Sequence, residues 1–242
     1  MAEKVKAIVI KSNDRKEKDK NILLFSLEKG KVWATLRSVK SPSAKMKTAQ
    51  NAFAFGEFML EEGKSGWVVT GFESIESFRE IPENIDKYFE ASAVLEVINQ
   101  LEFSSGSECA KVFVLTLKTL KTICFGKAKE NYSLCKFFIE LFKITGSPLF
   151  TTKCSCCGNV TFDKLHINYS IGELVCSNCK NLGCEELSKV TFQALKILDY
   201  TDFDRLETLK LAEGSQLALL KILCKNFDAR FSAKLKLMGI LS

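Results

Sequence analysis

The sequence predicts an α+β protein in which a small N-terminal β-barrel of the OB-fold type precedes an α-helical domain with an inserted four-cysteine zinc ribbon. Three observations support this prediction. Short β-branched and aromatic runs fill the first eighty residues, apolar residues take up helical spacing after Pro82, and two C-x-x-C pairs interrupt the helical part. We therefore expect a barrel over residues 1–80, helices over 81–150 and 185–242, and the ribbon over 151–184.

The barrel is predicted from strand runs and turn residues. The segment "VKAIVIK" is a short apolar strand, and "NILLFSLEKGKVWATLRSV" is a hairpin that turns at Gly30. A second hairpin is "FAFGEFMLEEGKSGWVVTGFESIESF", and the polar stretch "KSPSAKMKTAQ" between the two hairpins contains Pro42 and is a loop. About five short strands with one long basic loop favour an OB barrel, with an SH3-like barrel as the nearest alternative.

Helical patterns follow the barrel and resume after the cysteines. Ile85, Phe89, Val94, Leu95 and Ile98 lie at helical spacings in the first of them. The remaining segments are "CAKVFVLTLKTLKTICF", "NYSLCKFFIELFKITG", "SKVTFQALKILDY", "FDRLETLKLA" and "SQLALLKILCKNFDARFSAKLKLM". The stretch Gly146–Pro148 ends the third helix, immediately before the cysteine segment.

Four cysteines have the spacing of a structural zinc site. Cys154 and Cys157 form one C-x-x-C pair, Cys176 and Cys179 form the other, and 18 residues separate the pairs. Two thiolates three residues apart on a tight turn face one ion, and zinc takes four such ligands in a tetrahedron. Cys156 or Cys184 could replace one of these ligands, but either exchange would break the three-residue spacing. A redox pair or a four-iron cluster would also use cysteine thiolates, although neither usually has this spacing.

The sequence shows no sign of an enzyme. Four cysteines fill the coordination shell, and the only histidine, His166, is expected to be a surface or packing residue of the ribbon. We find no phosphate-binding glycine loop and no nucleophile elbow. No stretch predicts a signal peptide or a membrane span, so we expect a cytoplasmic protein whose thiols stay reduced.

Charge is distributed unevenly along the chain and points to nucleic acid. Residues 1–50 hold 13 Lys and Arg against 5 Asp and Glu, whereas residues 51–105 hold 3 against 11. Strand alternation places Trp33 and Arg37 on the outer face of the barrel, where a base could stack and a phosphate could pair; Trp33 packed beneath a helix is the alternative. The candidate DNA-binding residues are Lys11, Arg15, Lys31, Trp33, Arg37, Lys40, Lys45 and Lys47. A plain solvated surface is the alternative for the lysines.

The hairpin "ILLFSLEKGK", the basic loop "SPSAKMK" and the knuckles "CSCCG" and "CSNC" follow one another along nearly the whole chain. This ordered set of features resembles the bacterial DNA repair protein RecO family of recombination mediators. Where the family usually has Gly-Ala-Arg before the basic loop, this chain has "RSVKS". The resemblance implies an OB barrel followed by a helical domain with a zinc module.

The resemblance also implies a function and partners. Such proteins bind single- and double-stranded DNA, anneal complementary strands and, with RecR, load RecA onto DNA coated by single-strand-binding protein. They recognise the acidic C-terminal tail of that coat protein through the helical domain, and they are cytoplasmic and associated with the nucleoid. On the second predicted helix, Lys111, Lys118 and Lys121 share one face, and that face suits a second DNA contact, an acidic tail or solvent alone. The alternative function is a zinc-ribbon RNA-binding or translation-associated module without catalytic activity.

Overall fold

The structure is a computed structural model that describes residues 2–41, 46–64, 66–103, 106–149, 151–161, 164–237 and 239. Two compact units emerge from its internal contacts. One comprises Met1–Glu80 with Leu101–Val114, and the other comprises Ile81–Gln100 with Leu115–Ser242. The predicted boundaries at residues 80, 150 and 184 stay predictions.

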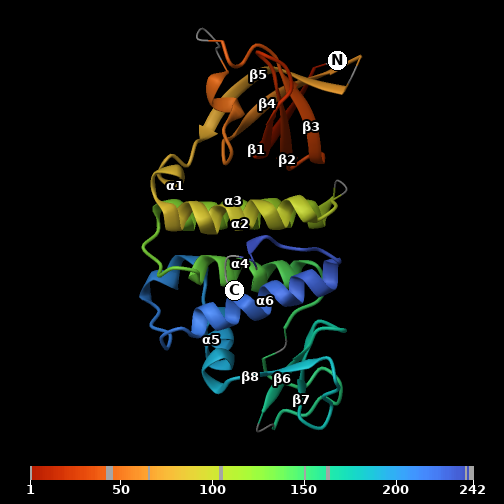
Figure 1. The fold of residues 1–242 in the computed structure, drawn as a ribbon, viewed down its shortest axis with the longest axis vertical. Coiled ribbons are helices and arrows are strands. Elements are labelled where there is room, and N and C mark those ends of the chain that lie inside the picture. Colours follow the sequence, from red (N-terminus) through yellow and green to blue (C-terminus); the bar gives the residue numbers. More distant parts are fainter. Residues whose placement is uncertain are drawn as a thin grey trace. The chain divides into compact units, whose positions relative to one another are not determined.

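Five strands close into a single barrel in the first unit (Figure 1, red to orange). They are β1 (Glu3–Asp14), β2 (Lys20–Ser26), β3 (Gly30–Leu36), β4 (Phe55–Gly63) and β5 (Gly66–Glu76). Their order is β1-β2-β3-β5-β4, and β1 closes the barrel by pairing with both β2 and β4. All pairings are antiparallel except that of β3 with β5. This arrangement confirms the prediction of an OB-type barrel.

Alternation along the strands separates the core of the barrel from its outer face. Val5, Ala7 and Val9 of β1 point inward, together with Ile22 and Leu24 of β2. A bulge between Val9 and Lys11 shifts the register of β1 by one residue. The short 3₁₀ helix η1 (Lys47–Gln50) adds the buried Ala49 to the same core. In the first unit, Phe113 also packs its ring on those of Phe25 and Phe55.

The helices are α1 (Glu80–Glu83), α2 (Ile85–Gln100), α3 (Ser107–Phe125), α4 (Tyr132–Ile144), α5 (Lys189–Tyr200) and α6 (Ser215–Phe231). In the second unit, α4 contacts α2, α5 and α6 and is buried along most of its length. The ring of Phe138 lies 5.9 Å from that of Phe227, which joins α4 to α6. The segment "FDRLETLKLA" is not the helix that its pattern suggests. It forms only the 3₁₀ helix η2 (Phe203–Thr208), which ends where the backbone becomes extended at Leu209.

The cysteine segment forms a small antiparallel sheet, drawn in teal in Figure 1. Its strands β6 (Leu165–Asn168), β7 (Glu173–Cys176) and β8 (Cys184–Leu187) have the order β7-β6-β8. We call residues 151–187 the cysteine module. Among the described residues, no helix has both the length and the apolar character that a membrane span requires.

Candidate metal centre and nucleic-acid interface

The structure brings Cys154, Cys157, Cys176 and Cys179 together. Their sulfur atoms all lie within 4.8 Å of one another, and those of Cys157 and Cys176 are 3.8 Å apart. Four sulfurs at about 2.3 Å from one ion in a tetrahedron would be roughly 3.8 Å apart. The group could therefore hold a metal ion, and its donor set is one that zinc accepts in structural sites.

Backbone turns aim these sulfurs at a common point. The N–H of Gly158 donates to the carbonyl of Cys154 at 2.9 Å, and Gly158 has the positive φ of 71° that this turn requires. The N–H of Cys179 closes the second turn on the carbonyl of Cys176 at 3.0 Å. The N–H of Cys176 donates to the sulfur of Cys154 at 3.3 Å, so each knuckle also supports the other.

Hydrogen bonding also adjusts the acidity of these thiols. Burial raises the pKa of Cys154, but N–H groups of Cys157, Cys176 and Cys156 stabilise its thiolate and bring the pKa down to about 6. The pKa of Cys179 is raised, chiefly by its hydrogen bond with the sulfur of Cys157. A thiolate is therefore available near neutral pH, and thiolates are the form that binds metal.

The neighbouring residues have other roles. Cys156 is exposed between the first two cysteines, and Cys184 packs against the group while its sulfur accepts the N–H of Asn181 at 3.3 Å. His166 is a packing residue of β6, with Nε2 3.8 Å from a carboxylate oxygen of Glu186. Burial lowers the pKa of His166, which favours the neutral form of the ring.

A second candidate site lies on the outer face of strands β1, β2 and β3. The register places Lys11, Leu23 and Trp33 in one row across the three strands. Trp33 is 46% exposed, which leaves part of the residue open to solvent. An exposed indole in the same row as a lysine two strands away, roughly 10 Å apart along the row, offers a base a surface on which to stack and a phosphate a partner.

The next row on this face is polar. Asn13, Asn21 and Thr35 lie opposite one another on the three strands. The guanidinium of Arg15, at the end of β1, donates to Thr35 Oγ1 and, at 3.4 Å, to Asn21 Oδ1. Arg15 is thereby held on the same face as Trp33, one row further along β3.

The other predicted residues are less uniformly placed. Lys31 pairs with Glu102 at 3.0 Å and Lys40 pairs with Asp14 at 3.0 Å, so each lysine already has a carboxylate partner. Arg37 is exposed just after β3. Lys47 is exposed on η1, which packs against β1 and β5. Lys45 lies outside the described residues.

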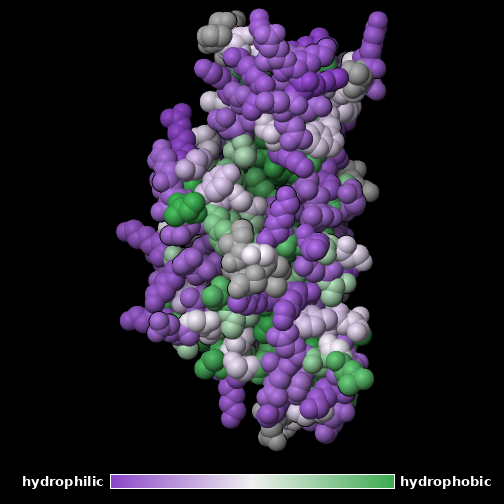
Figure 2. Space-filling view, in the orientation of Figure 1, coloured by the Kyte–Doolittle hydropathy of each residue, from purple (hydrophilic) through white to green (hydrophobic). Residues whose placement is uncertain are grey.

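Sequence reasoning missed Asn21, which lies opposite Thr35 on β2. Pairing the outward residues of "NILLFS" with those of "KVWATL" across the predicted hairpin would have found it. The surface of the molecule is seen in Figure 2, where the visible face of the barrel is mostly hydrophilic and hydrophobic side chains show on the cysteine module.

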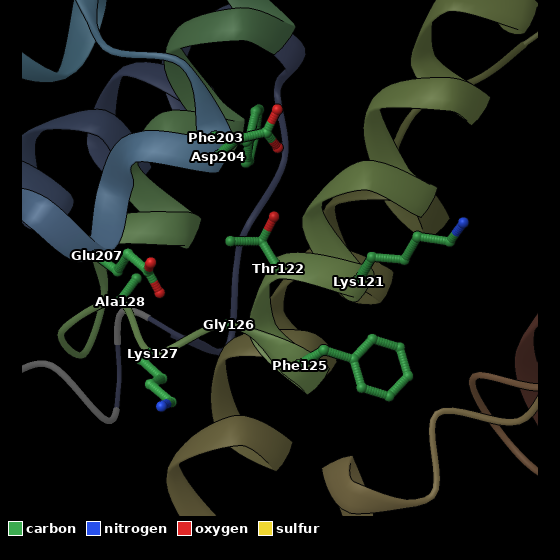
Figure 3. A pocket seen from close by; sticks show the side chains of 9 residues that line it. All are labelled: Lys121, Thr122, Phe125, Gly126, Lys127, Ala128, Phe203, Asp204 and Glu207. Atoms are coloured by element: carbon green, nitrogen blue, oxygen red, sulfur yellow. The ribbon is translucent and has the colours of Figure 1, made fainter.

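A hollow of about 300 Å³ lies between the end of α3 and η2 in the second unit. In Figure 3, Lys121 and Phe125 project from α3 away from η2, and Lys127 and Glu207 lie on the other side. Phe125 is 54% exposed. Lys118, one turn earlier, lies over the ring of Phe203 at 5.4 Å, which holds η2 against α3.

Comparison with known proteins gives matches over nearly the whole chain. Residues 1–78 match the family described as "Recombination protein O N terminal", and residues 82–237 match "Recombination protein O C terminal". "DNA repair protein RecO" of Clostridium novyi is 29% identical over 245 residues, which cover 99% of this chain and 93% of that protein. The proteins of the same name from Desulforamulus reducens and Thermoanaerobacter sp. are each 27% identical, over 96% and 86% of this chain and 91% and 84% of their own lengths.

Proposed function

Because the chain belongs to the RecO family and so has a role in DNA repair and recombination, we propose that it is a DNA-binding recombination mediator without catalytic activity. It binds single-stranded DNA on the outer face of β1, β2 and β3. The observation that carries this proposal is the exposed Trp33 in one row with Lys11, with the guanidinium of Arg15 fixed one row away. A base stacks on the indole while the two cations meet successive phosphates.

Annealing follows from the charge of the same region. Two DNA strands repel each other through their phosphates, and a basic protein surface lowers that repulsion by replacing their counterions. The excess of eight positive charges in residues 1–50, 13 cations against 5 anions, supplies such a surface. Double-stranded DNA contacts the same cations through its phosphates alone, because its paired bases are not free to stack on Trp33. Arg37, Lys40, Lys45 and Lys47 contribute phosphate contacts, and Lys31 contributes when it exchanges Glu102 for a phosphate.

The proposed protein partners are those of the family. We propose that the chain acts with RecR to load RecA onto DNA coated by single-strand-binding protein, in the cytoplasm and at the nucleoid. The acidic tail of the coat protein docks at Lys121 and Phe125, which lie four residues apart on α3 and project to one side. The ammonium of Lys121 suits the carboxylates of an acidic tail, and the exposed ring of Phe125 adds apolar contact area.

The cysteine group binds one structural Zn²⁺ in this proposal. All four donors are sulfurs, and a filled shell leaves zinc no open position for catalysis. The metal stabilises a small module in which the described cluster at the thiols buries Cys154, Val175 and Cys176.

The experiment is binding of the full chain to a fluorescent single-stranded oligonucleotide across a salt series. Each phosphate neutralised on a single strand contributes about −0.7 to the log–log slope, so a slope steeper than about −2 means roughly three or more contacts. Trp33→Ala should weaken binding by about 1–3 kcal/mol, and Trp33→Phe should restore most of it because a ring remains for stacking. Absence of binding at low salt would refute the proposal. Tighter binding to RNA of the same length would favour an RNA-binding module instead.

A further inference from the structure

We propose that Asp19, an acidic residue within the basic segment, is a positioning residue that fastens two basic loops into one preformed phosphate-binding edge. The inference rests on the proposed DNA binding and goes beyond it. The first loop, residues 15–19, connects β1 to β2, and the second, residues 37–41, follows β3. We call them together the basic edge.

Several contacts join the two loops. A carboxylate oxygen of Asp19 accepts the backbone N–H of Ser38 at 2.9 Å. The N–H of Lys40 donates to the carbonyl of Lys18 at 3.2 Å, and the ammonium of Lys40 pairs with Asp14 at 3.0 Å. The two loops, which are distant in sequence, therefore hold each other through backbone and side chains.

Asp19 bonds to a residue of the second loop whose backbone conformation is unfavourable. Ser38 has a φ of 52°, a left-handed conformation that is unfavourable for a residue with a side chain. Its N–H is oriented toward the carboxylate of Asp19, and that bond stabilises the turn immediately after Arg37. The carbonyl of Asp19 also accepts the N–H of Arg15 at 3.2 Å. One residue thus fixes the backbone beside two of the candidate cations.

The fixed edge matters because flexible cations bind phosphates weakly. Ordering a long basic side chain and its loop costs free energy at the moment of binding, and a preformed edge has already met that cost. Arg15 is then already held on the face that carries Trp33, and the backbone next to Arg37 is already fixed, before DNA arrives. Arg15 is anchored at Thr35, two residues along β3 from the indole.

A positioning role for Asp19 predicts the opposite sign from simple electrostatics. Removal of any acid near a DNA site should tighten binding, by about twofold for one charge in water at roughly 10 Å. Glu17 provides the matched control, because it is exposed in the same loop and takes no part in the contacts given above. Glu17→Ala and Asp19→Ala remove the same charge from the same loop, yet only the second releases Ser38.

The test measures the affinity of the full chain for a fluorescent single-stranded oligonucleotide at one low salt concentration. Glu17→Ala should bind about twofold more tightly than the wild type, and Asp19→Ala about three- to tenfold more weakly. Asp19→Asn, which keeps the oxygen acceptor without the charge, should bind at least as tightly as the wild type. Asp19→Glu, which keeps the charge but displaces the oxygen, should bind more weakly. Comparison of the Asn and Glu variants with the wild type tests the inference even if the alanine variant does not fold.

The outcomes separate the inference from the proposed function. Wild-type protein that does not bind DNA would remove the proposed function, and the inference with it. Wild-type binding together with an Asp19→Ala variant that tightens like Glu17→Ala would overturn the inference alone. So would an Asp19→Asn variant that binds more weakly than the wild type, because the retained oxygen acceptor would then not be what Asp19 supplies.

Discussion

Replacement of Gly172 by alanine should disconnect the cysteine module from the helices of its own unit. Gly172 lies in the turn between β6 and β7, and its carbonyl accepts the guanidinium of Arg230 and, at 3.2 Å, the side chain of Asn226. Arg230 also donates to the carbonyl of Ser147 at 2.6 Å and lies over the ring of Phe142 at 4.8 Å. One arginine of α6 therefore joins the module to the end of α4.

The size of the effect follows from two separate costs. Gly172 has a φ of 70°, and alanine in that conformation costs about 1–2 kcal/mol. A Cβ atom at this position would also lie 2.6 Å from Cζ and 2.7 Å from Nη2 of Arg230, so the guanidinium must move. Loss of one of its charge-assisted hydrogen bonds costs a further ~1.5–3 kcal/mol. The free energy of unfolding of the second unit should fall by the sum of the two costs, about 2.5–5 kcal/mol.

The assay is urea unfolding with zinc present, followed by far-ultraviolet circular dichroism, because most of the helices belong to the second unit. Gly214→Ala is the matched control. Gly214 has a φ of 73° and nothing within 4 Å of an added Cβ, so it bears only the conformational cost. In an Arg230→Ala background, Gly172→Ala should likewise cost only that amount. Equal destabilisation by Gly172→Ala and Gly214→Ala in the wild-type background would refute the reasoning.

Two further predictions concern the metal and the pH dependence of stability. Cys176→Ser should lose the metal and lower the thermal midpoint, whereas Cys156→Ser should keep about one zinc per chain, as measured by metal analysis. A finding of no zinc in wild-type protein purified without chelator would contradict this. Burial raises the pKa of Glu90 from 4.5 to about 7, although the N–H of Asn131 donates to it at 2.7 Å. The folded state then holds this proton more tightly than the unfolded state, so stability should fall as pH rises from 4.5 to about 7 and level off above it. From about pH 6 to about pH 8 the loss is about 1.4 kcal/mol. Urea unfolding across this range should show that Glu90→Gln removes this part of the slope, and an unchanged slope would mean that Glu90 is not its source.

Local patterns were sufficient to predict the parts of the fold that depend on neighbouring residues. The side of β3 that carries Trp33 follows from alternation within one hairpin, and the cysteine group follows from spacing within two tight turns. Longer-range features were not predictable in this way. The bulge in β1 places Lys11, rather than Ile10 or Ser12, opposite Leu23, and the packing of the whole barrel sets that register. The partners of Lys31 and Lys40 are 71 and 26 positions away in the chain, so no local pattern identifies them.

These ion pairs bear on how strongly salt should affect DNA binding. A phosphate that contacts Lys31 or Lys40 must compete with Glu102 or Asp14, and such an exchange releases fewer counterions than contact with an exposed cation. Among the described candidates, the exposed cations are Lys11, Arg15, Arg37 and Lys47. Phosphate contacts with all four would give a slope of log affinity against log salt near −2.8. Contacts with Lys11, Arg15 and Arg37 alone would give a slope of about −2. The total charge of residues 1–50 therefore overstates the electrostatic part of binding. If the proposed interface is correct, stacking on Trp33 should supply a part of the affinity that salt does not screen, and that part should remain in the salt series at high salt.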